Sequence, residues 1–231
     1  MTLQPAGRVH HQARRFVVGA AAVVAVAAPL VLAAARWPRW WSDIAPEQTP
    51  MTWLQSVVLT TAAAASAMAA VVDFRRLRRW LLLAAGLVAL AVDERFALHE
   101  RLRDNVLAPR GVALPFLPWV APGDFLLLAG AVTGLLLLPY LLPLFRPDRG
   151  AVRALWLGVG CAALAVGVDS IDPQTWTVAQ ERVQQSLEEC LELVSDLGLL
   201  TAVGLRLIGL SRPAGDGPPA GEPAQVVAAE R

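Results

Sequence analysis

Two short stretches of the chain concentrate side chains that can bind metal ions or transfer protons. The first stretch, VDERFALHERL, supplies Asp93, Glu94, His99 and Glu100. The second, SLEECLELVSD, supplies Glu188, Glu189, Glu192 and Asp196. Carboxylate oxygens bind hard cations such as Mg²⁺, Mn²⁺ and Ca²⁺, and a histidine in the same set also suits Zn²⁺ or Fe. These residue types therefore predict a metal-binding or acid–base site.

The spacing of the acids places them on helix faces. Asp93 and Glu100 are seven positions apart, so two helical turns bring them to the same face. Glu188, Glu192 and Asp196 recur every four positions and form a second stripe. Each stretch therefore presents a row of carboxylates on one side of a helix.

His99 does not fit the first of these faces if the helix is continuous. On such a helix it points about 100° away from Glu100. The pattern is therefore not the Glu-x-x-His arrangement of di-iron bundles. A local unwinding after Arg95 could bring His99 round.

Long apolar segments must position these residues. Of the 231 residues, 56% are hydrophobic and 17% are charged, whereas a soluble domain carries about 25% charged residues. Six apolar segments are each about long enough to cross a hydrocarbon core of ~30 Å. They are Phe16–Ala35, Trp53–Val72, Trp80–Leu98, Phe125–Phe145, Ala154–Val168 with its flanks, and Leu193–Leu210. We therefore predict an all-α, polytopic membrane bundle of about six transmembrane helices.

The segments outside the bundle differ from it in composition. We expect a membrane domain of residues 16–210 between a basic N-terminus of residues 1–15 and a tail of residues 211–231. The tail is rich in Pro and Gly, which predicts disorder. The paired arginines before the first apolar segment also resemble an export signal. That segment is longer than a typical signal core, so we expect it to be retained as a membrane helix.

The placement of arginine predicts the orientation. Arginines cluster before the first segment, in FRRLRR between the second and third, in RPDRGAVR between the fourth and fifth, and after the sixth. Basic loops face the cytoplasm, so both termini are expected there. The use of Arg without Lys is typical of a GC-rich bacterium, whose cytoplasmic (inner) membrane is the expected location. The net charge of +1 gives no reason to expect nucleic acid, and the lipid bilayer is the expected partner.

This topology brings the acids to one membrane face. The third, fifth and sixth segments all carry acids at their outer ends, Asp169 and Asp172 being those of the fifth. A charge near the bilayer centre costs about 2.5–3.5 kcal/mol, so the acids are expected to face one another. We expect them to share a cavity that opens outward beneath residues 101–123, which form either an ordinary interfacial loop or a partial lid.

Three functions remain open on this reading. In a metal-dependent hydrolase or transferase, Glu94 or Glu189 would act as the base. The metal ligands would then be Asp93, His99, Glu100, Glu188, Glu192 and Asp196. In a structural subunit, an Arg–carboxylate lattice would use Arg95, Arg101, Arg103 and Arg182. In a cation or proton transporter, the acids would bind and release the ion. The metal, the substrate and the oligomeric state are left open.

The two acidic stretches resemble a pattern in uncharacterised bacterial multi-pass membrane proteins. In those proteins an apolar helix ends in Leu-Asp-Glu-x4-His-Glu, and a later helix begins Glu-Glu-x-x-Glu with Gly downstream. The likeness covers Asp93, Glu94, His99 and Glu100, and then Glu188, Glu189, Glu192 and Gly198. It extends over a small part of the chain. The resemblance supports a site at these residues and implies no particular reaction.

Overall fold

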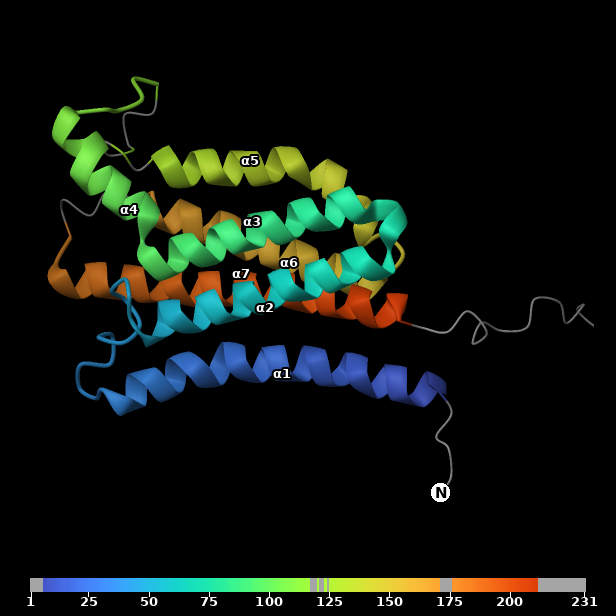
Figure 1. The fold of residues 1–231 in the computed structure, drawn as a ribbon. Coiled ribbons are helices and arrows are strands. Elements are labelled where there is room, and N and C mark those ends of the chain that lie inside the picture. Colours follow the sequence, from blue (N-terminus) through green and yellow to red (C-terminus); the bar gives the residue numbers. More distant parts are fainter. Residues whose placement is uncertain (1–5, 117–119, 121–122, 124, 171–175, 212–231) are drawn as a thin grey trace, which may run out of the picture.

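The computed structural model describes residues 6–116, 120, 123, 125–170 and 176–211 (Figure 1). Within these residues the fold contains helices and no strand, which confirms the all-α prediction. The predicted tail, the acid Asp172 and part of the 101–123 connection lie outside the described residues. The α-helices are α1 (Ala6–Ala35), α2 (Pro50–Val72), α3 (Leu77–Phe96), α4 (Leu98–Leu102), α5 (Phe125–Leu141), α6 (Arg149–Asp169) and α7 (Val178–Leu210).

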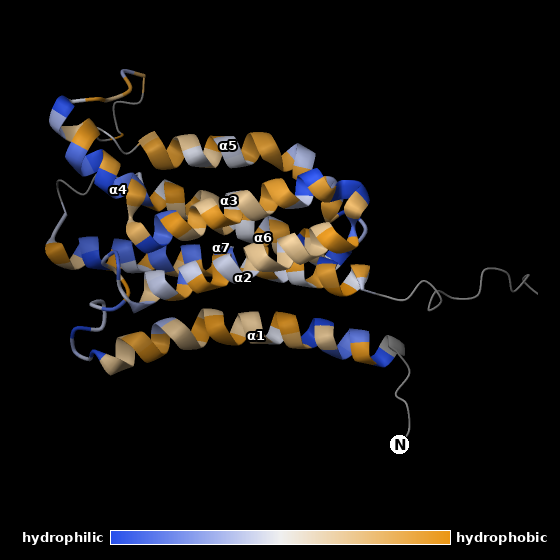
Figure 2. Ribbon diagram, in the orientation of Figure 1, coloured by the Kyte–Doolittle hydropathy of each residue, from blue (hydrophilic) through white to orange (hydrophobic). Residues whose placement is uncertain are grey.

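Five of the described helices are long and apolar enough to cross a membrane. They are Arg8–Ala35, Pro50–Val72, Phe125–Leu144, Arg149–Asp169 and Val178–Leu210. α3 corresponds to the third predicted segment. It begins with arginines and ends with charged residues, so its uncharged stretch is shorter than that segment. The long helices run side by side, with hydrophobic residues along their lengths and hydrophilic residues gathered at both ends of the bundle (Figure 2).

α6 and α7 pack closely against each other at a pair of glycines. A Cβ atom added to Gly198 would lie 2.8 Å from the Cα of Gly158, and one added to Gly158 would lie 2.9 Å from the carbonyl oxygen of Ser195. Small residues allow membrane helices to bring their backbones together in this way. The glycine pair therefore fixes α7, which carries half of the predicted site, against α6.

α2 holds α3 in place. Leu59 and Ala62 of α2 pack against Leu87 and Ala91 of α3. The Ser56 hydroxyl donates a hydrogen bond to the carbonyl oxygen of Ala91 at 3.1 Å. These contacts bury one side of α3, and so determine which of its acids turn toward α7.

The helix is interrupted sharply after α3. The helix ends at Phe96, and Ala97 has a left-handed backbone with φ 47° and ψ 51°. α4 follows at once, and then a π-helical turn at Arg103–Leu107 and a 3-10 turn at Ala108–Arg110. The structure therefore has an interruption of the helix shortly after Arg95, where an unwinding could bring His99 round. The predicted partial lid falls partly on residues 117–119 and 121–122, outside the described residues.

Candidate functional site: a carboxylate centre between α3 and α7

Three carboxylates from two helices meet at one end of the bundle. Glu94, Glu189 and Glu192 each offer an oxygen that lies within 4.8 Å of the corresponding oxygens of the other two. Glu189 and Glu192 are three positions apart on α7 and share a face, while Glu94 lies near the end of α3. Oxygen ligands lie about 2.0–2.6 Å from Mg²⁺ or Ca²⁺, so such oxygens can share one cation. We call these three residues the carboxylate centre.

Glu189 is the most deeply buried member of the centre. Its side chain is 4% exposed, and no described residue donates a hydrogen bond to its Oε2. On α2, Gln55 donates from Nε2 to the backbone oxygen of Glu189 at 3.1 Å, while its own Oε1 is buried and without a donor among the described residues. A buried polar atom without a partner costs about 1–3 kcal/mol. The two oxygens therefore mark a place where a positive or hydrogen-bonding group would be stabilised.

Further acids surround the centre. Asp196 lies one helical turn beyond Glu192 on α7 and is 7% exposed. Glu188 forms a hydrogen bond with Asp169 at the end of α6. Gln184 ties the same two helices together by donating to the carbonyl oxygen of Val168 at 2.7 Å. The ends of α3, α6 and α7 therefore bring carboxylates to one region.

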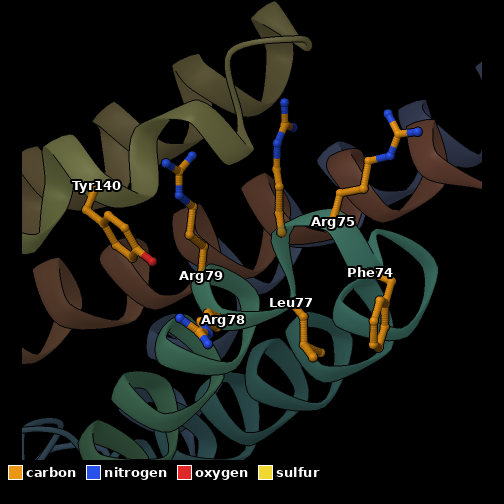
Figure 3. Close-up of a pocket in the computed structure, with 7 residues that line it drawn as sticks. Phe74, Arg75, Leu77, Arg78, Arg79 and Tyr140 are labelled. Atoms are coloured by element: carbon orange, nitrogen blue, oxygen red, sulfur yellow. The ribbon is translucent and has the colours of Figure 1, made fainter.

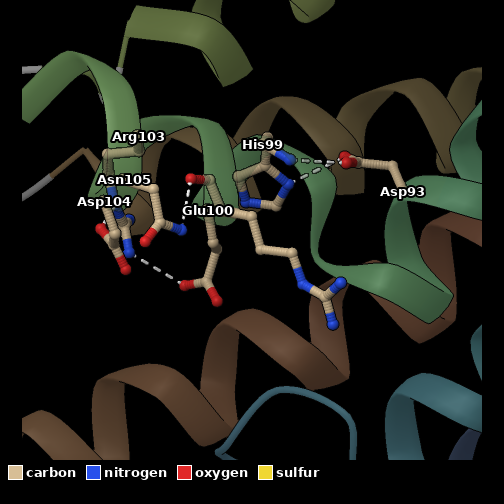
Figure 4. Close-up of polar contacts among 7 residues, drawn as sticks. Asp93, His99, Glu100, Arg103, Asp104 and Asn105 are labelled. Carbon is tan, nitrogen blue, oxygen red and sulfur yellow. Dashed lines mark hydrogen bonds and ion pairs between the residues drawn. The ribbon is translucent and has the colours of Figure 1, made fainter.

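Asp93 and His99 form a separate pair across the break at Ala97 (Figure 4). Asp93 Oδ1 accepts from the backbone N–H of His99 at 2.9 Å, and Asp93 Oδ2 lies 2.8 Å from His99 Nδ1. Burial acts against the protonated imidazole, but the hydrogen bond and charge of Asp93 outweigh it and raise the pKa of His99. Because Nδ1 of His99 contacts Asp93, Nε2 is the ring nitrogen that remains to exchange a proton or bind a ligand.

Glu100 also has a partner away from the centre. Its Oε1 lies 3.0 Å from Nη2 of Arg103, whose Nε donates to Asp104 at 2.8 Å (Figure 4). The structure therefore separates the predicted metal ligands. Glu192 meets the two predicted bases, Glu94 and Glu189, whereas Asp93, His99 and Glu100 have partners where the helix breaks.

Glu47 belongs to this acidic end, and the sequence reasoning missed it. It lies in the connection between α1 and α2, three residues before α2 begins. Burial, and then the nearby charges of Glu100 and Asp93, raise the pKa of Glu47 to about 7. The predicted topology already placed this connection on the outer face, and that was the signal that could have identified Glu47.

The expected arginine lattice does not reach the carboxylate centre. The guanidinium of Arg182 lies 3.8 Å from the ring centroid of Trp41, and that of Arg95 lies 5.9 Å from the ring centroid of Phe96. Arg103 pairs with Glu100 and Asp104. Among the described residues, no arginine forms an ion pair with the three members of the centre.

Comparison with known proteins gives one family match. Residues 10–207 match the family described as Domain of unknown function (DUF8692). No curated protein and no solved structure matches the chain. The match spans α1 through most of α7 and so includes the whole carboxylate centre.

Proposed function

The chain belongs to the DUF8692 family, and we propose that it is an integral membrane protein that binds a divalent cation at the carboxylate centre. We further propose that the bound cation serves hydrolysis or group transfer at the outer face of a bacterial cytoplasmic membrane. In this proposal α3 also crosses the membrane, which brings the number of spans to six. Both termini are cytoplasmic, and the carboxylate centre faces the outer side of the membrane.

The observation that carries the proposal is the environment of Glu189. Its Oε2 is buried without a hydrogen-bond donor among the described residues, and two more carboxylates lie beside it. Negative charges at this separation repel strongly in a medium of low dielectric, and a bound cation removes that repulsion. The donor set consists of carboxylate oxygens only, which favours Mg²⁺, Mn²⁺ or Ca²⁺ over Zn²⁺.

The chemistry follows from a cation with three protein ligands. Such an ion has coordination positions left for water and substrate, and it would polarise a substrate oxygen and acidify a bound water. With Glu94 and Glu189 as ligands, the Asp93–His99 pair is the better candidate for proton transfer. Asp93 orients the imidazole through Nδ1, and the charge of His99 acts on Glu192, so the two sites are electrostatically connected.

Metal binding to the full-length protein in detergent tests the proposal. After chelator treatment, Mn²⁺ is titrated and followed by electron paramagnetic resonance and by thermal unfolding. We expect one Mn²⁺ per chain and a rise in Tm, because a ligand at 100 times its Kd stabilises by about 2.7 kcal/mol. Glu189→Gln and Glu192→Gln should weaken binding about tenfold or more.

The matched control is Glu181→Gln, which removes an acid from the first turn of the same helix. It should bind Mn²⁺ like the unaltered protein. The Gln variants also remove crowded charge, so they are expected to fold. Equal Mn²⁺ affinity in the Glu189→Gln variant, or no Mn²⁺ binding to the unaltered protein, would refute the proposal.

Cation transport is a second candidate because polar side chains continue beyond the centre. Ser66 of α2 and Thr201 of α7 are 0% and 6% exposed, respectively, and lie farther along the bundle. Proteoliposomes loaded with a dye that Mn²⁺ quenches distinguish the two functions. Quenching that requires Glu192 supports transport, whereas stoichiometric binding without quenching supports a catalytic site.

A further inference from the structure

A basic pocket lies at the opposite end of α3 from the carboxylate centre. It has a volume of about 470 Å³ and is formed by the turn between α2 and α3 together with α5. Its lining includes Phe74, Arg75, Arg76, Arg78, Arg79 and Tyr140 (Figure 3). From Arg79 to Glu94 the helix rises about 22 Å at 1.5 Å per residue, so the pocket and the centre are separate sites.

The acids at this end already have partners. Asp73 accepts from Trp80 Nε1 at 3.3 Å and lies 3.7 Å from Arg76 Nη1. Asp148 is held by Arg14 and also accepts from two backbone N–H groups at the start of α6. Arg14 and the cap lower the pKa of Asp148, so it remains ionised within this pairing.

Three arginines of the turn are therefore uncompensated. Arg75, Arg78 and Arg79 form no ion pair with a carboxylate among the described residues. Figure 3 shows the side chains of Arg75 and Arg79 extending to the same side of the turn. The guanidinium of Arg79 lies 4.8 Å from the ring centroid of Tyr140, which helps to fix its position. Planar guanidinium groups bind phosphate through paired N–H donors.

Aromatic side chains distinguish a lipid from a free phosphate. Phe74 is 73% exposed and Tyr140 is 43% exposed. Exposed aromatic rings beside a basic cluster at the end of membrane helices suit the headgroup layer, where a ligand has an anionic head and an apolar body. Free phosphate would use only the arginines.

We propose that this pocket binds the phosphate headgroup of an anionic membrane phospholipid. Arg75 and Arg79 hold the phosphate, and Tyr140, whose ring lies beside Arg79, contacts the glycerol and acyl region. The site lies on the face that the arginine pattern assigns to the cytoplasm. It does not depend on the metal proposed for the carboxylate centre.

Native mass spectrometry of the full-length protein in detergent tests this assignment. The probes are dioleoyl phosphatidylglycerol, dioleoyl phosphatidylcholine and sodium phosphate. Phosphatidylglycerol should bind with defined stoichiometry, and its affinity should fall about tenfold when Arg75→Gln and Arg79→Gln are combined. Arg75→Gln alone should weaken it less, and because Arg75 is exposed this variant leaves the packing intact.

Arg110→Gln is the matched control, since Arg110 is an exposed arginine at the other end of the bundle. It should bind phosphatidylglycerol like the unaltered protein. Equal affinity for phosphatidylcholine, or unchanged affinity in the double variant, would overturn the proposal. Displacement of phosphatidylglycerol by equimolar sodium phosphate would show a site for free phosphate and would also overturn it.

Discussion

The Asp93 carboxylate contacts His99 twice across a break in the helix. Its Oδ1 accepts a hydrogen bond from the His99 backbone N–H at 2.9 Å, and its Oδ2 lies 2.8 Å from the ring Nδ1. The two residues are six positions apart, a spacing that does not bring side chains together on a continuous α-helix. The left-handed conformation of Ala97 is what permits the contact. The pair therefore serves both as a cap for the broken helix and as a titratable unit beside the carboxylate centre.

The raised pKa of His99 predicts how stability depends on pH. The protonated imidazole is favoured in the folded state, so this contribution is fully present below the ordinary His pKa of about 6.5. It is lost as the pH rises through the higher folded-state pKa. We expect His99→Asn to flatten this decline, because Asn can still donate a hydrogen bond to Asp93 but does not titrate. Tm measured in chelator across this range, with His10→Asn as the control, checks the expectation.

Glu47 predicts a second effect of pH. Its folded-state pKa of about 7 exceeds the ordinary value of 4.5, so the folded state keeps a proton that the unfolded state has released. Stability therefore falls as the pH rises from the lower value through the higher. Glu47→Gln should stabilise the metal-free protein above neutral pH by on the order of 2 kcal/mol and have little effect near the lower value. Equal Tm gains at both ends of this pH range would contradict this origin.

The left-handed backbone of Ala97 predicts different effects on stability for two substitutions at this position. Ala97 has φ 47° and is 2% exposed. Valine is β-branched and disfavours positive φ strongly, so Ala97→Val should lower stability by about 2 kcal/mol or more. Ala97→Gly relieves about 1 kcal/mol of strain but loses a buried methyl worth about 0.8 kcal/mol, so it should be nearly neutral. Thermal unfolding of both variants tests the break, and a tolerated valine would argue against it.

The contact between α6 and α7 predicts opposite effects at two nearby glycines. Gly198→Ala places a methyl 2.8 Å from the backbone of Gly158, which cannot move aside, and should cost about 1–3 kcal/mol. Gly160→Ala on α6 meets nothing within 4 Å and should be neutral or stabilising by up to about 1 kcal/mol. If the two variants had the same Tm, the close crossing would be wrong.

The proposed topology predicts which side of the membrane each loop occupies. Single cysteines are introduced at Leu77 and Val112 in a background with Cys161→Ser and Cys190→Ser. In intact cells an impermeant maleimide should label position 112, and it should reach position 77 only after permeabilisation. Labelling of position 77 in intact cells would reverse or abolish the arrangement of six spans.

The helices could be predicted well from the sequence. Which acids meet in the carboxylate centre, and which have partners elsewhere, could not. Long apolar runs predict helices whatever their neighbours, and charge placement indicates which ends come together. Adjacent residues on a helix point about 100° apart, so choosing between Asp93 and Glu94 requires the rotation of α3. The packing of Leu87 and Ala91 against α2 sets that rotation, and no local pattern reveals it.

The helix break at Ala97 and the place of Glu47 beside the site could not be predicted from the sequence, for different reasons. Alanine is the best helix former, so Ala97 gives no local signal of a helix end, even though an unwinding after Arg95 could bring His99 round. Glu47 lies in an irregular connection that also contains Asp43, and it belongs to no periodic stripe of acids. Its burial comes from tertiary contacts, which only the folded chain provides.

The touching backbones of Gly158 and Gly198 have a consequence for movement within the protein. With no side chain between them to change rotamer, α6 and α7 cannot slide past each other without losing contact. Glu189 and Glu192 are therefore carried on a rigid frame. Glu94 is carried on α3 two residues before that helix ends. Any contraction of the carboxylate centre that requires backbone movement would then move the end of α3, and Asp93, His99 and the chain beyond Ala97 would move with it.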